Sequence, residues 1–176
     1  MSRLAHAEAL LQLAIALDEE KKTALQPLEL VPADDPVLLE TAEVVNTDAA
    51  SVSHLVKALK HAVHAYGGLG LAAPQVGLSE RAFAIRGKKT GEVYVAINPQ
   101  ILRTGSQIVE EIEGCLSLPG QRFEVARPRV CDVEYFDPDQ GKTVRRTLKG
   151  REARCFQHEF DHLEGILISR IGKECS

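Results

Sequence analysis

The sequence predicts an α+β fold, in which mostly antiparallel β-sheets pack around a helix that carries a His-Glu-x-x-His motif, with an additional helix at the N-terminus. Helical periodicity dominates both ends of the chain, whereas short runs of β-forming residues fill the middle. Neighbouring runs lie too close together for the crossover helices of a doubly wound parallel sheet. Helices, then strands, then a helix therefore indicate an α+β domain.

The composition is typical of one soluble globular domain. The chain has 176 residues, of which 44% are hydrophobic and 26% are charged. Its formal net charge of −4 argues against a general binder of nucleic acid or anionic membranes, which carries a basic surplus. No run in the sequence approaches the roughly 18 apolar residues of a membrane span. We therefore expect no direct nucleic-acid specificity and no membrane partner.

The N-terminal segment predicts an amphipathic helix over residues 4–25. Residues 9–17 are apolar enough to pass for the core of an export signal, but Arg3 is the single basic residue ahead of them and an acidic run follows directly. We therefore divide the chain into an N-terminal helical extension, residues 1–27, and a main domain, residues 28–176.

The four cysteines, at positions 115, 131, 155 and 175, form no C-x-x-C pair and no tight framework of spacings. In a chain of this size without a convincing export signal, such cysteines are more typical of free thiols or metal ligands than of disulfides. We therefore expect a cytoplasmic location.

A second helix is predicted between a cap at residues 46–48 and a stop at Gly67. Apolar residues recur at helical spacing between these limits, at Val52, Leu55, Val56, Leu59 and Val63.

Five short strands follow in the middle of the chain. They are predicted over residues 81–86, 92–97, 107–112, 130–136 and 142–148. Asn98-Pro99 is expected to end the second strand, because proline cannot donate to a ladder. The turn formers at residues 137–141 join the last two strands in a hairpin. Helical character returns over residues 151–163, and Gly165 ends that helix.

Residues 157–162, QHEFDH, are the first that indicate chemistry. His158 and His162 lie four residues apart, so a helix projects both from one face, one turn apart. Two imidazoles at that separation can share a divalent metal, and Glu159 between them can reach a bound water. The alternative is an exposed polar helix face on which histidine and glutamate are salt-linked.

A catalytic site of this kind needs a third protein ligand and an open position. Glu164 follows His162 by only two residues, so it points away from the shared face. Cys155, three residues before His158, lies on that face, whereas Cys115 follows a glycine that permits an unusual backbone turn. A lone buried cysteine is more often a small hydrophobe than a ligand, and spacing alone leaves the choice between the two thiols open.

Three ordered segments resemble the peptide deformylase family. They are GLGLAAPQ at residues 68–75, EGCLS at residues 113–117 and QHEFDH at residues 157–162. The family shows G-x-G-L-A-A-x-Q, E-G-C-L-S and Q-H-E-x-D-H in that order, and all three match without a substitution. Similar segments at residues 97–99 and 162–165 extend the likeness over about residues 28–171, so the main domain resembles a deformylase catalytic domain.

The resemblance implies a metal centre in which Cys115, His158 and His162 hold one divalent ion. Fe(II) is the metal expected in vivo, and Zn(II), Ni(II) or Co(II) are expected as substitutes in preparations. Cys155 then falls where the family lines the pocket for the substrate's first side chain, although simple packing under the helix is an equal alternative.

The resemblance also implies the catalytic and substrate-binding groups. Glu159 is the general base and later the general acid, and the Gln75 amide and the Leu116 backbone N–H donate to the oxygen of the attacked carbonyl. Leu69 lines the methionine pocket, and Gly70, lacking Cβ, lets a peptide lie close to the backbone.

The implied substrate is the N-formyl-methionyl end of a newly synthesised polypeptide, from which formate is released. A transient ribosome contact is left open, because the chain ends soon after Ile171 where many relatives continue into a helix that docks there. Two alternatives differ in class: a non-catalytic metal- and peptide-binding relative, and a metalloprotease acting on internal peptide bonds. Intact Gln75, Leu116 and Glu159 argue against the first, and the cysteine ligand argues against the second.

Overall fold

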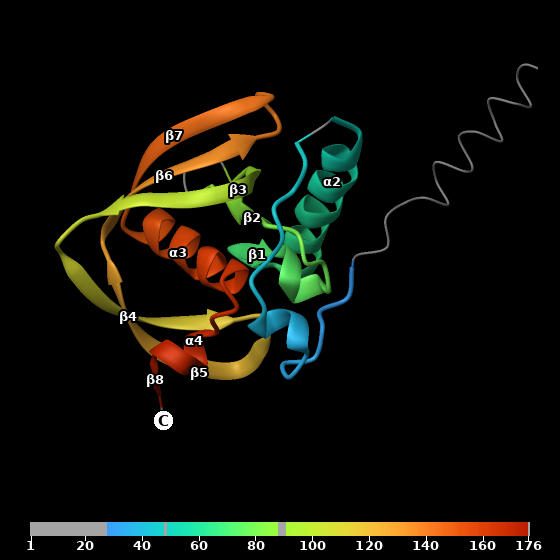
Figure 1. Ribbon diagram of the computed structural model, residues 1–176. Coiled ribbons are helices and arrows are strands. Elements are labelled where there is room, and N and C mark those ends of the chain that lie inside the picture. The colour runs from blue at the N-terminus through green and yellow to red at the C-terminus, as the bar shows by residue number, and fades with distance from the viewer. Residues whose placement is uncertain (1–27, 48, 88–90, 176) are drawn as a thin grey trace, which may run out of the picture.

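The computed structural model describes residues 28–47, 49–87 and 91–175 (Figure 1). The helix predicted over residues 4–25 lies outside this described part, so the division into an extension and a main domain stays a prediction. In the described part the fold is α+β with antiparallel sheets, and the predicted class is confirmed.

Two sheets form the framework (Figure 1). The larger contains, in spatial order, β1 (Gly70–Ala72), β2 (Ala82–Arg86), β3 (Val93–Thr104), β6 (Val130–Asp137) and β7 (Lys142–Lys149). The smaller contains, in spatial order, β4 (Ile108–Cys115), β5 (Leu118–Pro128) and β8 (Lys173–Glu174). Every neighbouring pair within these sheets runs antiparallel.

Two long helices pack on this framework. They are α2 (Ala49–Tyr66) and α3 (Arg151–Leu163), and the shorter helical turns are η1 (Pro36–Leu39), η2 (Ala73–Val76) and α4 (Ile168–Ile171). Helix α3 lies between the larger and the smaller sheet, whereas α2 covers the opposite face of the larger sheet (Figure 1). Among the helices of the described chain, none combines the length and the apolar character that crossing a bilayer requires.

Strand β2 shows how one sheet serves both helices. Ala82 and Ala84 belong to the core cluster that contains α2, whereas Phe83 and Ile85 belong to the cluster that contains α3. Successive side chains of a strand point to opposite faces, so a continuous apolar run is what a strand covered on both faces requires. The Phe83 ring meets Phe156 of α3 edge to face, with ring centroids 4.9 Å apart.

Two strand predictions were wrong. Strand β3 does not end at Asn98-Pro99 but continues to Thr104, because the register shifts between Ile97 and Gln100 and this irregularity accommodates the proline. Asn98 adopts a positive φ of 49°, and its side chain exchanges two hydrogen bonds with the backbone of Val45. Strand β5 was not predicted at all, because Pro119, Gly120 and several charged residues interrupt its alternation.

Candidate metal centre

Helix α3 presents its two histidines toward the smaller sheet. His158 and His162 lie one turn apart, with ring centroids 5.1 Å apart. The helix ends where Gly165 adopts a φ of 68°. A Cβ at that position would lie 2.5 Å from the Leu39 carbonyl oxygen, so glycine is required both by the turn and by the close packing.

Cys115, at the end of β4, offers a third candidate ligand atom. Its Sγ lies 3.2 Å from His162 Nε2, and the ligand atoms of Cys115, His158 and His162 all lie within 4.8 Å of one another. Cys155, which spacing alone left as a rival, lies outside this group and lines the neighbouring pocket. The geometry therefore brings together the three residues that the resemblance implied.

The donor set fits one divalent transition metal, because a thiolate sulfur and two imidazole nitrogens are ligands that such ions prefer. Burial and the neighbouring His158 hold the pKa of His162 well below its usual value, so that ring is neutral and can offer a lone pair. Burial alone would lower the pKa of His158, but hydrogen bonds with Cys115 and Glu113 outweigh it and raise the pKa to about 10. A metal that bound here would therefore have to displace a proton from His158.

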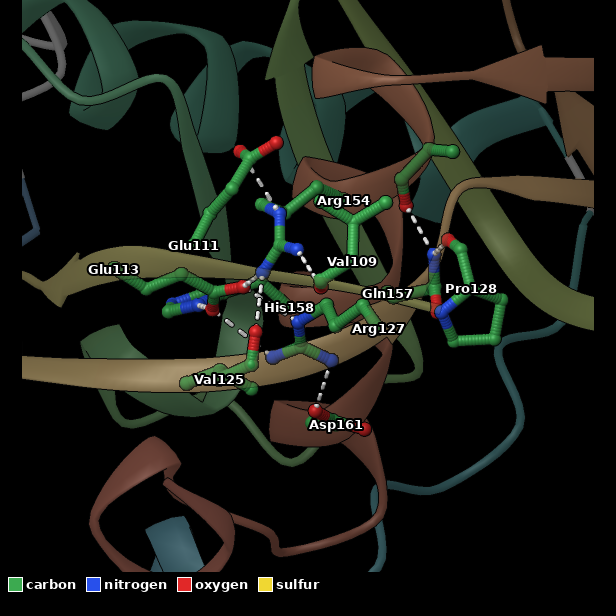
Figure 2. Close-up of polar contacts among 11 residues, drawn as sticks. Val109, Glu111, Glu113, Val125, Arg127, Pro128, Arg154, Gln157, His158 and Asp161 are labelled. Carbon is green, nitrogen blue, oxygen red and sulfur yellow. Dashed lines mark hydrogen bonds and ion pairs between the residues drawn. The ribbon is translucent and has the colours of Figure 1, made fainter. Parts of the chain in front are cut away.

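A buried ion-pair network supports His158 from behind (Figure 2). His158 Nδ1 lies 2.9 Å from Glu113 Oε2, and Arg127 donates to both oxygens of the same carboxylate at 2.6 and 3.0 Å. Arg127 also donates to Asp161 Oδ2 at 2.7 Å. Burial acts to raise the pKa of Glu113, but the hydrogen bonds from His158 and Arg127 lower it to about 2, so the carboxylate is ionised and accepts the His158 N–H.

Sequence reasoning missed the roles of Glu113, Arg127 and Asp161. Glu113 and Asp161 stand inside the segments EGCLS and QHEFDH, which is a signal that could have found them. Arg127 carries no local signal, since its partners lie 14 and 34 residues away in the sequence.

Glu159 is the buried carboxylate beside the three candidate ligand residues. Burial raises its pKa to about 7. Among the described residues, none hydrogen-bonds to its Oε2 atom. A Cβ built on Gly70 would overlap Glu159 Oε1, so the missing side chain of Gly70 makes room for this carboxylate. Sequence reasoning assigned Gly70 to a tight backbone turn and to substrate approach, and did not foresee this packing role.

Gln75 approaches the group from η2. Its Oε1 accepts from the Ala72 backbone N–H at 2.9 Å, which fixes the orientation of the amide. Its Nε2 therefore faces the thiol, 3.6 Å from Cys115 Sγ, and donates to Ser117 Oγ at 3.1 Å. An amide donor held beside the ligand atoms can stabilise negative charge that develops there.

A pocket of about 570 Å³ opens beside these groups. Eight of the nine site residues that the sequence singled out line it, and the ninth, His162, is buried and is not among the lining residues. The lining residues singled out from the sequence are Leu69, Gly70, Gln75, Cys115, Leu116, Cys155, His158 and Glu159. The pocket is therefore where a substrate can meet the carboxylate of Glu159, the amide of Gln75 and the candidate ligands Cys115 and His158, with His162 buried next to them.

The fold and the site define a class of protein: an α+β domain in which a cysteine, two helical histidines and a buried carboxylate lie together beside one pocket. A sequence profile described as polypeptide deformylase matches residues 27–175. The chain belongs to the peptide deformylase family, which consists of metal-dependent enzymes.

Curated relatives and solved structures agree on this family. The peptide deformylase of Synechocystis sp. is 36% identical over 158 residues, which cover 88% of this chain and 84% of that protein. The peptide deformylase of Thermotoga maritima is 40% identical over 134 residues, covering 76% of this chain and 80% of that protein. A crystal structure of a peptide deformylase from Synechococcus elongatus in complex with actinonin matches with a TM-score of 0.78 and 36% identity, covering 85% of this chain and 81% of that one.

Proposed function

We propose that this chain removes the N-formyl group from the N-terminal formyl-methionine of newly synthesised polypeptides and releases formate. The observation that carries the proposal is that Glu159, Gln75 and the three candidate ligand residues lie together beside one pocket. Family membership gives the reaction class, and these side chains supply a base, an oxyanion donor and a ligand set for it.

Cys115, His158 and His162 would hold one divalent ion, and Fe(II) is the ion that we propose for the cell. When bound, the ion would lower the pKa of a water molecule and polarise the formyl oxygen. Glu113 keeps His158 in the tautomer whose Nε2 faces the ligand group, because its carboxylate accepts the Nδ1 hydrogen at 2.9 Å.

Glu159 is the proposed proton carrier. A carboxyl group with a pKa of about 7 is divided between its two forms near neutral pH, so it can accept a proton from the attacking water and later pass it to the departing amine. The water oxygen forms a bond to the formyl carbon, the bond between that carbon and the methionine nitrogen breaks, and the proton that Glu159 took from the water reaches that nitrogen. The acid product gives up its remaining acidic proton, which the amine takes up, so formate and a free, protonated N-terminus result.

Gln75 and the Leu116 backbone N–H are the proposed donors to the oxygen that gains negative charge during the attack. The hydrogen bond from Ala72 N–H to Gln75 Oε1 supports this role, since it aims the donor end of the amide at the ligand group. One such donor contributes roughly 2.7–4 kcal/mol in comparable sites.

The pocket is proposed to take the methionine side chain, with Leu69, Gly70 and Cys155 among its lining residues. A formyl group carries only hydrogen on its carbonyl carbon, so it fits where a larger acyl group would clash. Nascent chains in the cytoplasm are the proposed partners, and the four free cysteines agree with that location. A transient ribosome contact also remains a proposal.

The test is anaerobic turnover of a formyl-Met tripeptide by Fe(II)- or Ni(II)-loaded protein, followed by formate release. We expect Glu159→Ala to lower kcat by about 10²–10⁴-fold while the protein keeps its metal, because the proton carrier is lost and the ligands are not. Cys115→Ser is expected to lose both metal and turnover, whereas Cys155→Ser keeps its metal.

An acetyl-Met tripeptide of the same sequence is the matched substrate control and should not be hydrolysed. If the metal-loaded parent binds the formyl peptide but releases no formate, a binding protein is favoured over an enzyme. Cleavage of an internal peptide bond in place of formate release would favour the metalloprotease.

A further inference from the structure

Arg154 is a buried arginine that the chemistry above does not use. It lies on α3 four residues, about one turn, ahead of His158, so both side chains leave the same face of the helix. Its side chain is 11% exposed and enters the space between α3 and the smaller sheet (Figure 2). Burying a guanidinium costs free energy unless its N–H donors are satisfied, so we ask which groups accept hydrogen bonds from Arg154.

All three guanidinium nitrogens of Arg154 are occupied. Nη1 donates to Glu113 Oε1 at 2.6 Å and to the Val125 carbonyl oxygen at 2.9 Å. Nη2 donates to the Val109 carbonyl oxygen at 2.6 Å, and Nε lies 3.2 Å from Glu111 Oε2. Val109 belongs to β4 and Val125 to β5, so this one side chain fastens both strands of the smaller sheet to α3.

Glu113 is held between two side chains of the same helix. Arg154 binds its Oε1, and His158, four residues later, binds its Oε2. Because the two contacts come from successive turns of α3, they fix both the position of the carboxylate and its rotation. Arg127 of β5 neutralises the charge of Glu113 and links it to α3 only indirectly, through Asp161.

The same contact sets where the thiol lies. Cys115 follows Glu113 by two residues on β4, with a register irregularity between them. A strand fixed at Val109 and Glu113 can deliver the Cys115 sulfur at one distance from the histidine rings. A shift of this strand would move the sulfur and the orienting carboxylate together.

We propose that Arg154 is a positioning residue for the metal centre: it holds Glu113 against His158 and fastens β4 to α3, so that the three ligand atoms are preorganised. This inference rests on the proposed metal-dependent function. Groups that orient metal ligands in this way typically contribute 10–100-fold to metal affinity.

The test compares Arg154→Met, Arg154→Lys and the parent, each loaded with one equivalent of Co(II). Two properties are measured besides turnover: the visible spectrum of the Co(II)–thiolate centre and the rate of metal loss to an excess chelator. We expect Arg154→Met to lose metal about 10–100-fold faster and to show an altered spectrum. Arg154→Lys keeps the charge but cannot bridge two strands and a carboxylate, so it should fall between Arg154→Met and the parent.

Arg145→Met is the matched control. Arg145 forms an ion pair with Glu134 on the hairpin of β6 and β7, and its side chain is 75% exposed. This substitution should leave the spectrum and the rate of metal loss unchanged. If Arg154→Met does not fold, Arg154→Lys decides alone. A folded Arg154 variant with the parent's spectrum and rate of metal loss would overturn the inference.

The proposed function fails in a different way. A parent that shows no Co(II)–thiolate spectrum would overturn the metal centre and, with it, the role of Arg154. A parent that binds Co(II) and releases formate, together with Arg154 variants that match it, would overturn the role of Arg154 alone.

Discussion

The two sides of α3 are built from different interactions. Toward the larger sheet the helix presents apolar residues, among them Ala153, Phe156 and Leu163, all fully buried in one cluster. Toward the smaller sheet it presents Arg154 and His158, which meet carboxylate and carbonyl groups of β4 and β5. One helix is therefore held by apolar burial on one side and by ion pairs and hydrogen bonds on the other.

The apolar side of α3 mainly contributes stability, whereas the polar side mainly fixes the positions of atoms. Apolar burial is non-directional and contributes roughly 25 cal/mol per Å² removed from water. Buried ion pairs add little net stability, because desolvation offsets most of the attraction, but their directional hydrogen bonds fix atoms in place. We therefore expect changes on the apolar side to lower the free energy of unfolding and changes on the polar side to alter the metal centre of a protein that still folds.

The largest stability effect is predicted for Phe156→Ala. Removing a fully buried phenylalanine leaves a cavity against Phe83, and the free energy of unfolding should fall by about 3–5 kcal/mol. Urea denaturation followed by circular dichroism measures it. Metal content per folded molecule should stay at the parent's level. A parallel loss of metal affinity would contradict the claim that the apolar side of α3 sets stability and the polar side sets the metal centre.

A smaller effect is predicted for Gly70→Ala. The added Cβ overlaps Glu159 Oε1, so the carboxylate has to move, and a displacement of about 1 Å can lower kcat by about 10²-fold. Formate release at saturating substrate measures it, with metal content determined on the same sample. Unchanged kcat would mean that the position of Glu159 is not what limits the reaction.

The smallest effect is predicted for Cys155→Ala. This side chain lies on α3 between the two sides, lines the pocket and packs against the apolar cluster. Losing one sulfur atom from an apolar pocket should raise KM for a formyl-Met peptide by about tenfold or less, with kcat nearly unchanged. A large loss of metal would instead indicate that Cys155 takes part in the centre.

Helix α3 could be predicted from the sequence because its signals are local. Histidines four residues apart, an apolar stripe and a terminal glycine fix its bounds and the direction of its imidazoles. Strand β5 could not be predicted, since Pro119 and Gly120 interrupt the alternation and only its pairing with β4 makes it a strand. The continuation of β3 past Pro99 likewise depends on pairing with β6.

The candidate site likewise contains residues that local spacing predicts and residues that only long-range contacts bring into place. The histidine pair and Glu159 follow from helical spacing, but the choice between Cys115 and Cys155 does not, because it depends on where β4 lies relative to α3. The contacts of Glu113 with Arg127 and Arg154 span 14 and 41 residues, and no local pattern encodes them. These long-range polar contacts are what the folded structure adds to the sequence.

The ligand set is the central claim, and X-ray absorption at the zinc edge of the stoichiometrically zinc-loaded protein tests it most directly. The structure predicts one sulfur scatterer at about 2.3 Å and two imidazole nitrogens at about 2.0–2.1 Å. The sulfur shell should disappear in Cys115→Ser and persist in Cys155→Ser. Two sulfur scatterers in the parent, or a sulfur shell that survives in Cys115→Ser, would contradict the assignment of Cys115, His158 and His162 as the metal ligands.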